Sequence, residues 1–265
     1  MAVISWDNYL DDSTIVNSSD GSEVLTVQNL LTRQLGDIFR QTTSTQLIVD
    51  IDLGSAKLTN LICILNHTNL AGESYTLDFG TSSGGSQVGT ETGTFFTGAT
   101  SDATNEMIYL TSGHTARYVR LTVTISSTTV SIGRIWLDNA WSTTAGMEFS
   151  VSVADPSPVT RSRGGSIFIS ERKRARRVAC KGFALTENDF RGTVGDSLYK
   201  SYLTMDLAVG TSGEIVFLPL TDSQINRNRL GVYGHVSNSQ PMKVMDRTTS
   251  DGLSIEKRFT VEEDF

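Results

Sequence analysis

The chain has 265 residues, with 22 lysines and arginines against 29 aspartates and glutamates and with 38% hydrophobic residues. This length predicts about two compact domains, each large enough to bury its own core. No stretch approaches the ~20 apolar residues of a membrane-spanning helix, and the early acidic residues do not match a signal peptide, so we expect neither a membrane span nor secretion.

Charge and proline content both change near residue 145. Residues 1–145 hold 6 lysines and arginines against 14 aspartates and glutamates, whereas residues 146–265 hold 16 against 15. All 4 prolines lie in the second part. We therefore predict two domains, covering residues 1–145 and 146–265.

Alternating apolar residues predict buried strands in the first domain. Residues 46–54 read QLIVDIDLG, and residues 116–125 read ARYVRLTVTI. In both segments every second residue is apolar, which places one apolar row on the inner face of a sheet. The first strand is expected to end at Gly54. Residues 81–98, rich in serine, threonine and glycine, are expected to form a long exposed loop. Short strands and turns of this kind predict an antiparallel sandwich.

Three carboxylates on predicted strands form the first candidate site. Asp50 and Asp52 are two residues apart and share a strand face, and with Asp78 they could act as acid and base or hold a cation. A solvated outer face is the simpler interpretation. Residues 80–84 match the G-x-S-x-G pattern, but the glycine-rich segment that follows cannot form the helix that a nucleophilic serine needs.

No other pattern indicates catalysis. His67, His114 and His235 have no second histidine or cysteine at metal-ligand spacing. Cys63 and Cys180 lie in apolar strands of different predicted domains, which favours buried, reduced thiols. We predict that the protein is not an enzyme and that it uses no cofactor and no metal.

Four motifs of the first domain occur in a recognisable order over roughly residues 20–140. They are Asn29-Leu30, Asp52-Leu53-Gly54, the YVRL-like strand at residues 117–121, and Arg134-Ile135-Trp136. This order resembles the discoidin or galactose-binding-like family, also called the coagulation factor 5/8 type C family. The resemblance implies a jelly-roll β-sandwich for residues 1–145 and suggests carbohydrate recognition, to which the loop at residues 81–98 would contribute.

The second domain is predicted to be a β-barrel or sandwich with one helix. The helix is expected over residues 195–209, where Tyr202 and Met205 share an apolar stripe that Leu203 and Leu207 widen. Gly210 then ends the helix. The expected strands cover residues 147–153, 166–170, 214–220, 229–236 and 253–261.

A basic segment is the strongest charge feature of the chain. It contains Arg172, Lys173, Arg174, Arg176 and Arg177. Such a cluster can bind nucleic acid through phosphate neutralisation. Alternatively, it forms a hairpin tip or a protected edge strand, or it meets an acidic neighbouring subunit. We favour these alternatives because the whole chain is acidic and no interleaved aromatic residues offer base stacking. The segment is therefore a candidate subunit interface.

Three aromatic residues lie near the edges of the predicted domains. Trp6, Tyr9 and Trp141 could stack on sugars, or they could seal a contact between domains or subunits. We favour the contact and keep glycan stacking as an alternative. Trp136, in an apolar strand, is expected in the core.

The order of elements after residue 146 resembles the ring-forming barrel of phage tail-tip proteins, including distal tail proteins. It comprises strands, a basic hairpin, one helix, a VFLP-type strand and a terminal strand ending in acids. The resemblance implies a structural component of a phage virion tail tip or baseplate that forms a homo-oligomeric ring.

We therefore predict a virion protein made in the host cytoplasm, with copies of itself, other tail-tip or baseplate proteins and host-surface carbohydrate as partners. Nucleic acid is not an expected partner. The alternative is a carbohydrate-binding module for host attachment. A secreted glycosidase is disfavoured because neither a signal nor a catalytic domain is recognisable.

Overall fold

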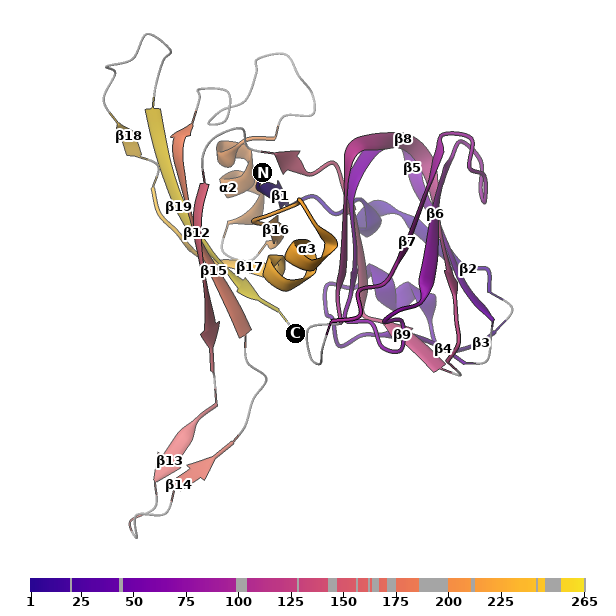
Figure 1. Cartoon of the computed structure of the whole chain (residues 1–265), viewed down its shortest axis with the longest axis horizontal. Coiled ribbons are helices and arrows are strands. Elements are labelled where there is room, and N and C mark those ends of the chain that lie inside the picture. The colour runs from indigo at the N-terminus through magenta and orange to yellow at the C-terminus, as the bar shows by residue number, and fades with distance from the viewer. Residues whose placement is uncertain are drawn as a thin grey trace. The chain divides into compact units, whose positions relative to one another are not determined.

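The structure is a computed structural model (Figure 1). It describes residues 1–19, 21–42, 45–98, 104–127, 129–142, 147–155, 157–161, 163, 167–170, 175–185, 200–210, 213–241, 243–245 and 254–264.

The chain folds into two compact units, and each unit is assembled from separate stretches of sequence. Unit 1 consists of Met1–Trp6, Trp141–Pro219 and Val232–Phe265, and unit 2 consists of Asp7–Ala140 and Leu220–Gly231. These units depart from the predicted domains 1–145 and 146–265 at both ends of the first range and around residues 220–231. The departures follow from one strand and one helix, described below.

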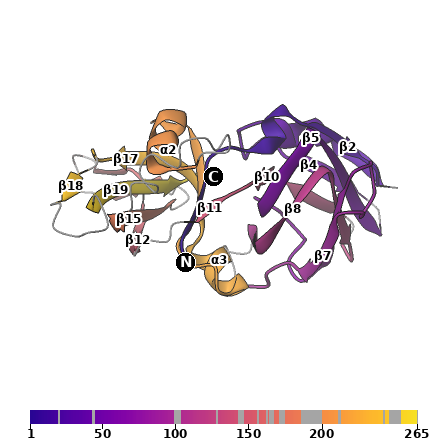
Figure 2. The same cartoon turned by 90° about the horizontal axis from the view of Figure 1, so that it is seen from above.

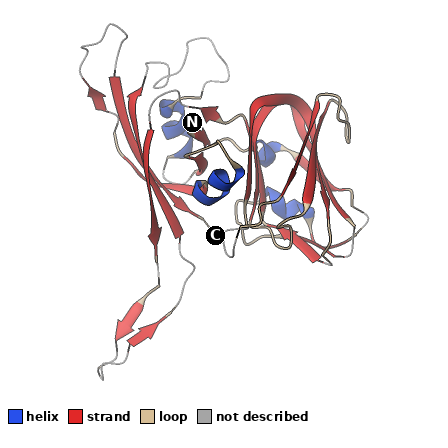
Figure 3. Cartoon of the chain, viewed as in Figure 1, coloured by secondary structure: helices blue, strands red, loops and turns tan. Residues whose placement is uncertain are grey.

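Unit 2 is an antiparallel sandwich of two sheets, composed mainly of strands (Figure 3). The larger sheet has the order β10-β5-β8-β6-β7, with β2 also paired to β5, and the smaller sheet has the order β3-β4-β9. The predicted mainly β fold with a jelly-roll sandwich is confirmed. The strands are β2 (Thr14–Asn17), β3 (Ser22–Leu25), β4 (Phe39–Thr42), β5 (Gln46–Leu65), β6 (Ser74–Gly80), β7 (Gly89–Thr94), β8 (Glu106–Thr124), β9 (Thr129–Ile132) and β10 (Arg134–Asp138).

The core of unit 2 lies between the two sheets, and the alternation predicted from the sequence fills it. Leu47 and Val49 of β5 are fully buried, as is Val123 of β8. Trp136 is 1% exposed, which confirms its place in the core. Burying each such side chain contributes roughly 1.5–3 kcal/mol before the entropy cost of ordering it.

Two predicted boundaries in unit 2 are wrong. Strand β5 does not end at Gly54; a shift of register between Asp52 and Lys57 lets β5 and β8 bend together and continue pairing. Gly54 accommodates this bend with φ of 75°. The segment at residues 81–98 is not one loop, because Gly89–Thr94 forms β7 and pairs with β6.

Helix α3 (Gln224–Leu230) belongs to unit 2 although it lies far along the sequence. It packs on β8 through a buried polar network. The Asn228 side chain accepts a hydrogen bond from the Met107 backbone N–H at 2.7 Å and donates to Glu106 at 3.1 Å. Gln224 also donates to the Glu106 carboxylate, at 2.8 Å. Burial raises the pKa of Glu106, against the opposing effect of these hydrogen bonds.

We predict that Asn228→Ala destabilises unit 2 by about 2 kcal/mol, because it leaves a buried N–H and a buried carboxylate each without one partner. Asn228 is 1% exposed. Urea unfolding followed by a probe in unit 2 measures the loss. Asn226→Ala is the matched control, since Asn226 lies on the same helix and donates to the exposed Asp222, which precedes the helix. Equal stability of the two variants would contradict this role of Asn228.

Unit 1 is built on one eight-stranded sheet with the order β11-β1-β16-β17-β19-β15-β12, to which β18 adds by pairing with β19. A separate pair, β13 and β14, continues from β12 and β15 as a hairpin arm (Figure 1). The strands are β1 (Val3–Ser5), β11 (Trp141–Ser142), β12 (Met147–Ala154), β13 (Val159–Arg161), β14 (Ile167–Ile169), β15 (Ala175–Leu185), β16 (Glu214–Leu218), β17 (Val232–Ser239), β18 (Lys243–Met245) and β19 (Ser254–Glu263).

The first strand of the chain explains why Met1–Trp6 belongs to unit 1. Strand β1 pairs with β16 on one side and β11 on the other, and Val3 and Ile4 are fully buried. Gly234 of β17 permits close packing against β19, since a Cβ there would lie 1.8 Å from the backbone oxygen of Glu262.

Helix α2 (Tyr202–Val209) covers one face of the unit 1 sheet (Figure 2). Tyr202 and Met205 are buried as predicted, and Gly210 ends the helix with φ of 53°. The predicted widening of the stripe is wrong at Leu207, whose side chain is 78% exposed. Residues 195–199 of the predicted helix lie outside the described residues. No described helix has the length and apolarity needed to cross a membrane.

Candidate functional site

The outward face of the larger sheet in unit 2 carries a cluster of charged and hydroxyl side chains. We call it the outer polar face and define it as Asp50, Asp52, Asp78, Thr90, Arg117, Tyr118 and Arg120. Strand register brings these residues together: Asp50 of β5 and Asp78 of β6 both stand opposite Arg120 of β8, and Thr90 of β7 stands opposite Asp78. One cross-strand row therefore carries two carboxylates, a guanidinium and a hydroxyl.

Arg120 and Asp50 form the centre of this face. Arg120 donates two hydrogen bonds to the Asp50 carboxylate, at 2.6 and 2.9 Å, in the bidentate geometry that favours strong pairing. Ser18 Oγ also donates to Asp50. Burial opposes ionisation of Asp50, but the hydrogen bonds from Arg120 and Ser18 outweigh it, so the pKa of Asp50 lies below its ordinary value.

A second bidentate pair adjoins the first. Arg117 donates to Asp52 at 2.8 and 2.9 Å, and these bonds lower the pKa of Asp52 to about 2. The Arg117 guanidinium also lies 5.0 Å from the centre of the Tyr118 ring. Tyr118 is partly exposed, so an aromatic surface stands beside two fixed guanidinium groups.

The loop between β6 and β7 borders the outer polar face. Gly84, in that loop, has φ of 68°, and a Cβ there would lie 2.6 Å from Arg120 Nη2. The loop backbone therefore approaches the guanidinium closely. Across the row, the Thr90 hydroxyl donates to one oxygen of the Asp78 carboxylate at 2.7 Å.

We predict that Arg117→Met raises the pKa of Asp52 toward its ordinary value of 3.8, because Arg117 is the largest cause of the lowering. In the wild type, the ion pair stabilises the fold above the ordinary pKa and is lost as the pH falls toward 2. Carboxyl NMR titration measures the midpoint. An unchanged Asp52 titration in the variant would contradict the pairing; Arg33→Met is the control because Arg33 lies on another surface and is mostly exposed.

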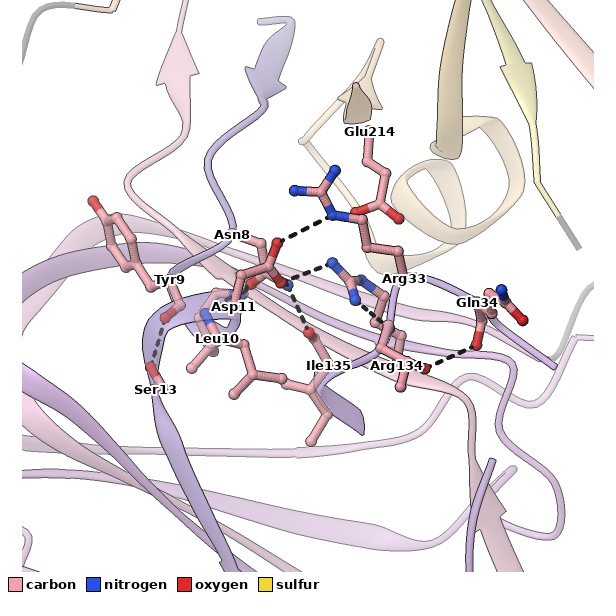
Figure 4. Close-up of polar contacts among 12 residues, drawn as sticks. Asn8, Tyr9, Leu10, Asp11, Ser13, Arg33, Gln34, Arg134, Ile135 and Glu214 are labelled. Atoms are coloured by element: carbon pink, nitrogen blue, oxygen red, sulfur yellow. Dashed lines mark hydrogen bonds and ion pairs between the residues drawn. The ribbon is translucent and has the colours of Figure 1, made fainter. Parts of the chain in front are cut away.

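A different cluster, around Arg134, serves as an anchor inside unit 2 (Figure 4). Arg134 is fully buried, donates to Asp11 at 2.9 Å and also bonds to the Thr32 carbonyl oxygen. Asn8 accepts from the Leu137 N–H at 3.0 Å and donates to the Ile135 carbonyl at 3.2 Å. The arginine that begins β10 thus secures the first turn of unit 2, and its burial leaves no exposed surface for a ligand.

The basic segment lies only partly within the described residues. Arg172, Lys173 and Arg174 are outside them. Arg176 donates to Glu263 at 2.9 and 3.0 Å, and Arg177 donates to Glu262 at 2.8 Å. Both described arginines therefore pair with the acidic end of the same chain, and their strand, β15, lies between β12 and β19 rather than at an edge. The role of the segment as a subunit interface remains a prediction.

The three candidate glycan-stacking residues do not gather in one unit. Tyr9 belongs to unit 2, is 7% exposed and lies under Lys57, whose Nζ is 4.7 Å from the ring centre. Trp6 and Trp141 belong to unit 1, where their rings pack edge to face at 6.3 Å. Trp141 also packs on Tyr202 at 4.8 Å. The tryptophans thus contribute to the core of unit 1, and glycan stacking by these three residues remains a prediction.

The two cysteines and His67 are buried. Cys63 and Cys180 are buried free thiols, as predicted, and burial raises the pKa of each thiol. His67 is 2% exposed, and burial lowers its pKa to about 4. Within the part of the chain that the structure describes, no three histidine, cysteine or acidic residues form a group that could hold a metal ion.

Comparison with known proteins gives no family. No protein-family model matches the chain, and no curated protein matches it. Among solved structures, a lectinolysin lectin domain complexed with Lewis b has 11% identity and a TM-score of 0.41, covering 51% of this chain and 96% of its own.

Two further similar structures are sugar-binding modules. A chitosan-binding module from Paenibacillus sp. IK-5 has 21% identity and a TM-score of 0.38, covering 49% of this chain and 98% of its own. A fucose-binding module from Streptococcus pneumoniae has 12% identity and a TM-score of 0.40, covering 50% and 95%. None of these three structures is of a phage tail-tip protein.

Proposed function

We propose that unit 2 is a carbohydrate-binding module and that it binds sugar on the outer polar face. The observation that carries the proposal is the row of Asp50, Arg120, Asp78 and Thr90, which strand pairing fixes beside the exposed part of Tyr118. The proposed activity is binding without bond cleavage.

The chemistry of this row matches that of a sugar. Each hydroxyl of a pyranose can donate one hydrogen bond and accept two, so neighbouring hydroxyls require acceptors and donors placed side by side. Carboxylates supply acceptors, and guanidinium groups supply donors in a fixed plane. An aromatic ring supplies a surface for the C–H face of the sugar. The bidentate Asp50–Arg120 pair holds these groups before the ligand arrives, which reduces the entropy cost of binding.

Isothermal titration of the full chain with Lewis b, fucose and chitosan oligosaccharide tests the proposal. We expect saturable binding of at least one of these sugars, and a loss of about tenfold or more in affinity for Asp78→Asn or Arg120→Met. Arg33→Met is the matched control and should bind like the wild type, because Arg33 lies outside the outer polar face and is 68% exposed.

Two results would overturn the proposal. The first is the absence of binding to these sugars and to a broad glycan array by a chain whose folding is verified by circular dichroism. The second is binding that Arg120→Met leaves intact while circular dichroism shows the wild-type fold. In that second case a sugar site would lie elsewhere in the chain.

A second candidate function is the tail-tip structural role implied by the sequence resemblance. The observation that favours it is the hairpin arm of unit 1, where Val159 and Ile167 are 59% and 54% exposed. Isolated two-stranded hairpins are marginally stable in water, so an arm of this kind suits a protein that packs against others. Electron microscopy of the purified chain should then show rings, and a uniformly non-ring particle would contradict the role.

A further inference from the structure

Strand β12 lies at the edge of the unit 1 sheet among the described strands. It ends the strand order, and all eight of its residues pair without interruption with β15 on one side. Among the described residues, no strand pairs with its other side. A free edge presents unpaired backbone N–H and C=O groups, and proteins usually protect such edges with charged side chains, especially lysine, with proline or with a bulge. Within Met147–Ala154 there is no lysine, proline or bulge, and Glu148 is the one charged residue.

Two apolar side chains in the second half of β12 are also exposed. Met147 and Phe149 pack partly against the core of unit 1, but Val151 and Val153, on the same side of the strand, are 42% and 63% exposed. The exposed apolar surface thus continues from the end of the core along the edge strand. Contiguous exposed apolar residues of this kind mark interaction sites.

We propose that β12 pairs antiparallel with β12 of a second copy of this chain, with the two-fold axis at Ser150. In this register the four large apolar residues of the strand meet one another: Met147 lies opposite Val153 of the second copy, and Phe149 lies opposite Val151. The surface is then self-complementary, as a two-fold interface requires.

Charge favours a second copy in this orientation. Glu148 is the one charged residue of the strand. Parallel, in-register pairing would place the two Glu148 carboxylates side by side, which is destabilising. Antiparallel pairing at Ser150 instead places Glu148 opposite Ser152 of the second copy. Ser152 is itself paired with Arg177 on β15, whose side chain is 49% exposed. A guanidinium group therefore lies one strand beyond Ser152, on the side away from Glu148 of the second copy.

Cysteine cross-linking tests the register. Antiparallel neighbours have Cα atoms about 4.5–5.5 Å apart, within disulfide range, so Ser150→Cys should form a disulfide-linked dimer under mild oxidation. Ser152→Cys is the matched control, because its partner is Glu148 and it should remain monomeric on a non-reducing gel. The native thiols at Cys63 and Cys180 are buried and do not compete.

Solution mass tests the interface itself. Light scattering of the full chain should show a dimer that dissociates on dilution, and Val151→Lys should weaken it by about tenfold or more. Val24→Lys, at a 52% exposed valine of unit 2, should leave the dimer unchanged. A monomer at every concentration, a dimer unaffected by Val151→Lys, or equal cross-linking by the two cysteine variants would overturn the proposal. This test does not depend on sugar binding, so either proposal can fail alone.

Discussion

The antiparallel pairing of β5 with β8 is the constraint on which unit 2 depends. These two long strands supply the inner apolar rows of the larger sheet, and β2, β6 and β10 pair with one or the other of them. The same register brings Asp50 to Arg120 and Asp52 to Tyr118. The core and the outer polar face are therefore two faces of one pairing, and a slip of one residue would exchange them.

The strand pairing holds the ion pairs of the outer polar face in one geometry. An exposed ion pair on a mobile surface contributes little, because ordering two long side chains costs entropy. Here each guanidinium is fixed on a central strand and bonded through two nitrogens, and the backbone of the β6–β7 loop approaches Arg120. A face of this kind presents donors and acceptors in a constant pattern, which suits recognition of a rigid, hydroxyl-rich ligand.

The sequence predicted local features well because they depend on local patterns. Alternation identified Leu47, Val49 and Val123 as core residues, and Gly210 was recognised as a helix stop. Features that depend on distant pairing were missed. Arg120 and Asp50 are 70 residues apart, so their pairing follows only from the strand register.

The assignment of α3 to unit 2 rests likewise on contacts of Asn228 with β8, about which the local sequence carries no signal. Residues 147–153 were predicted as a strand, but their alternation does not reveal that the core of unit 1 ends before Val151 and Val153.

Backbone NMR of the full chain during titration with a bound sugar tests whether the outer polar face holds the ligand. We expect the amide shifts to concentrate at Asp78, at residues 81–88 and at residues 117–120. Shifts concentrated around Trp6 and Trp141 instead, with the outer polar face unperturbed, would contradict this expectation.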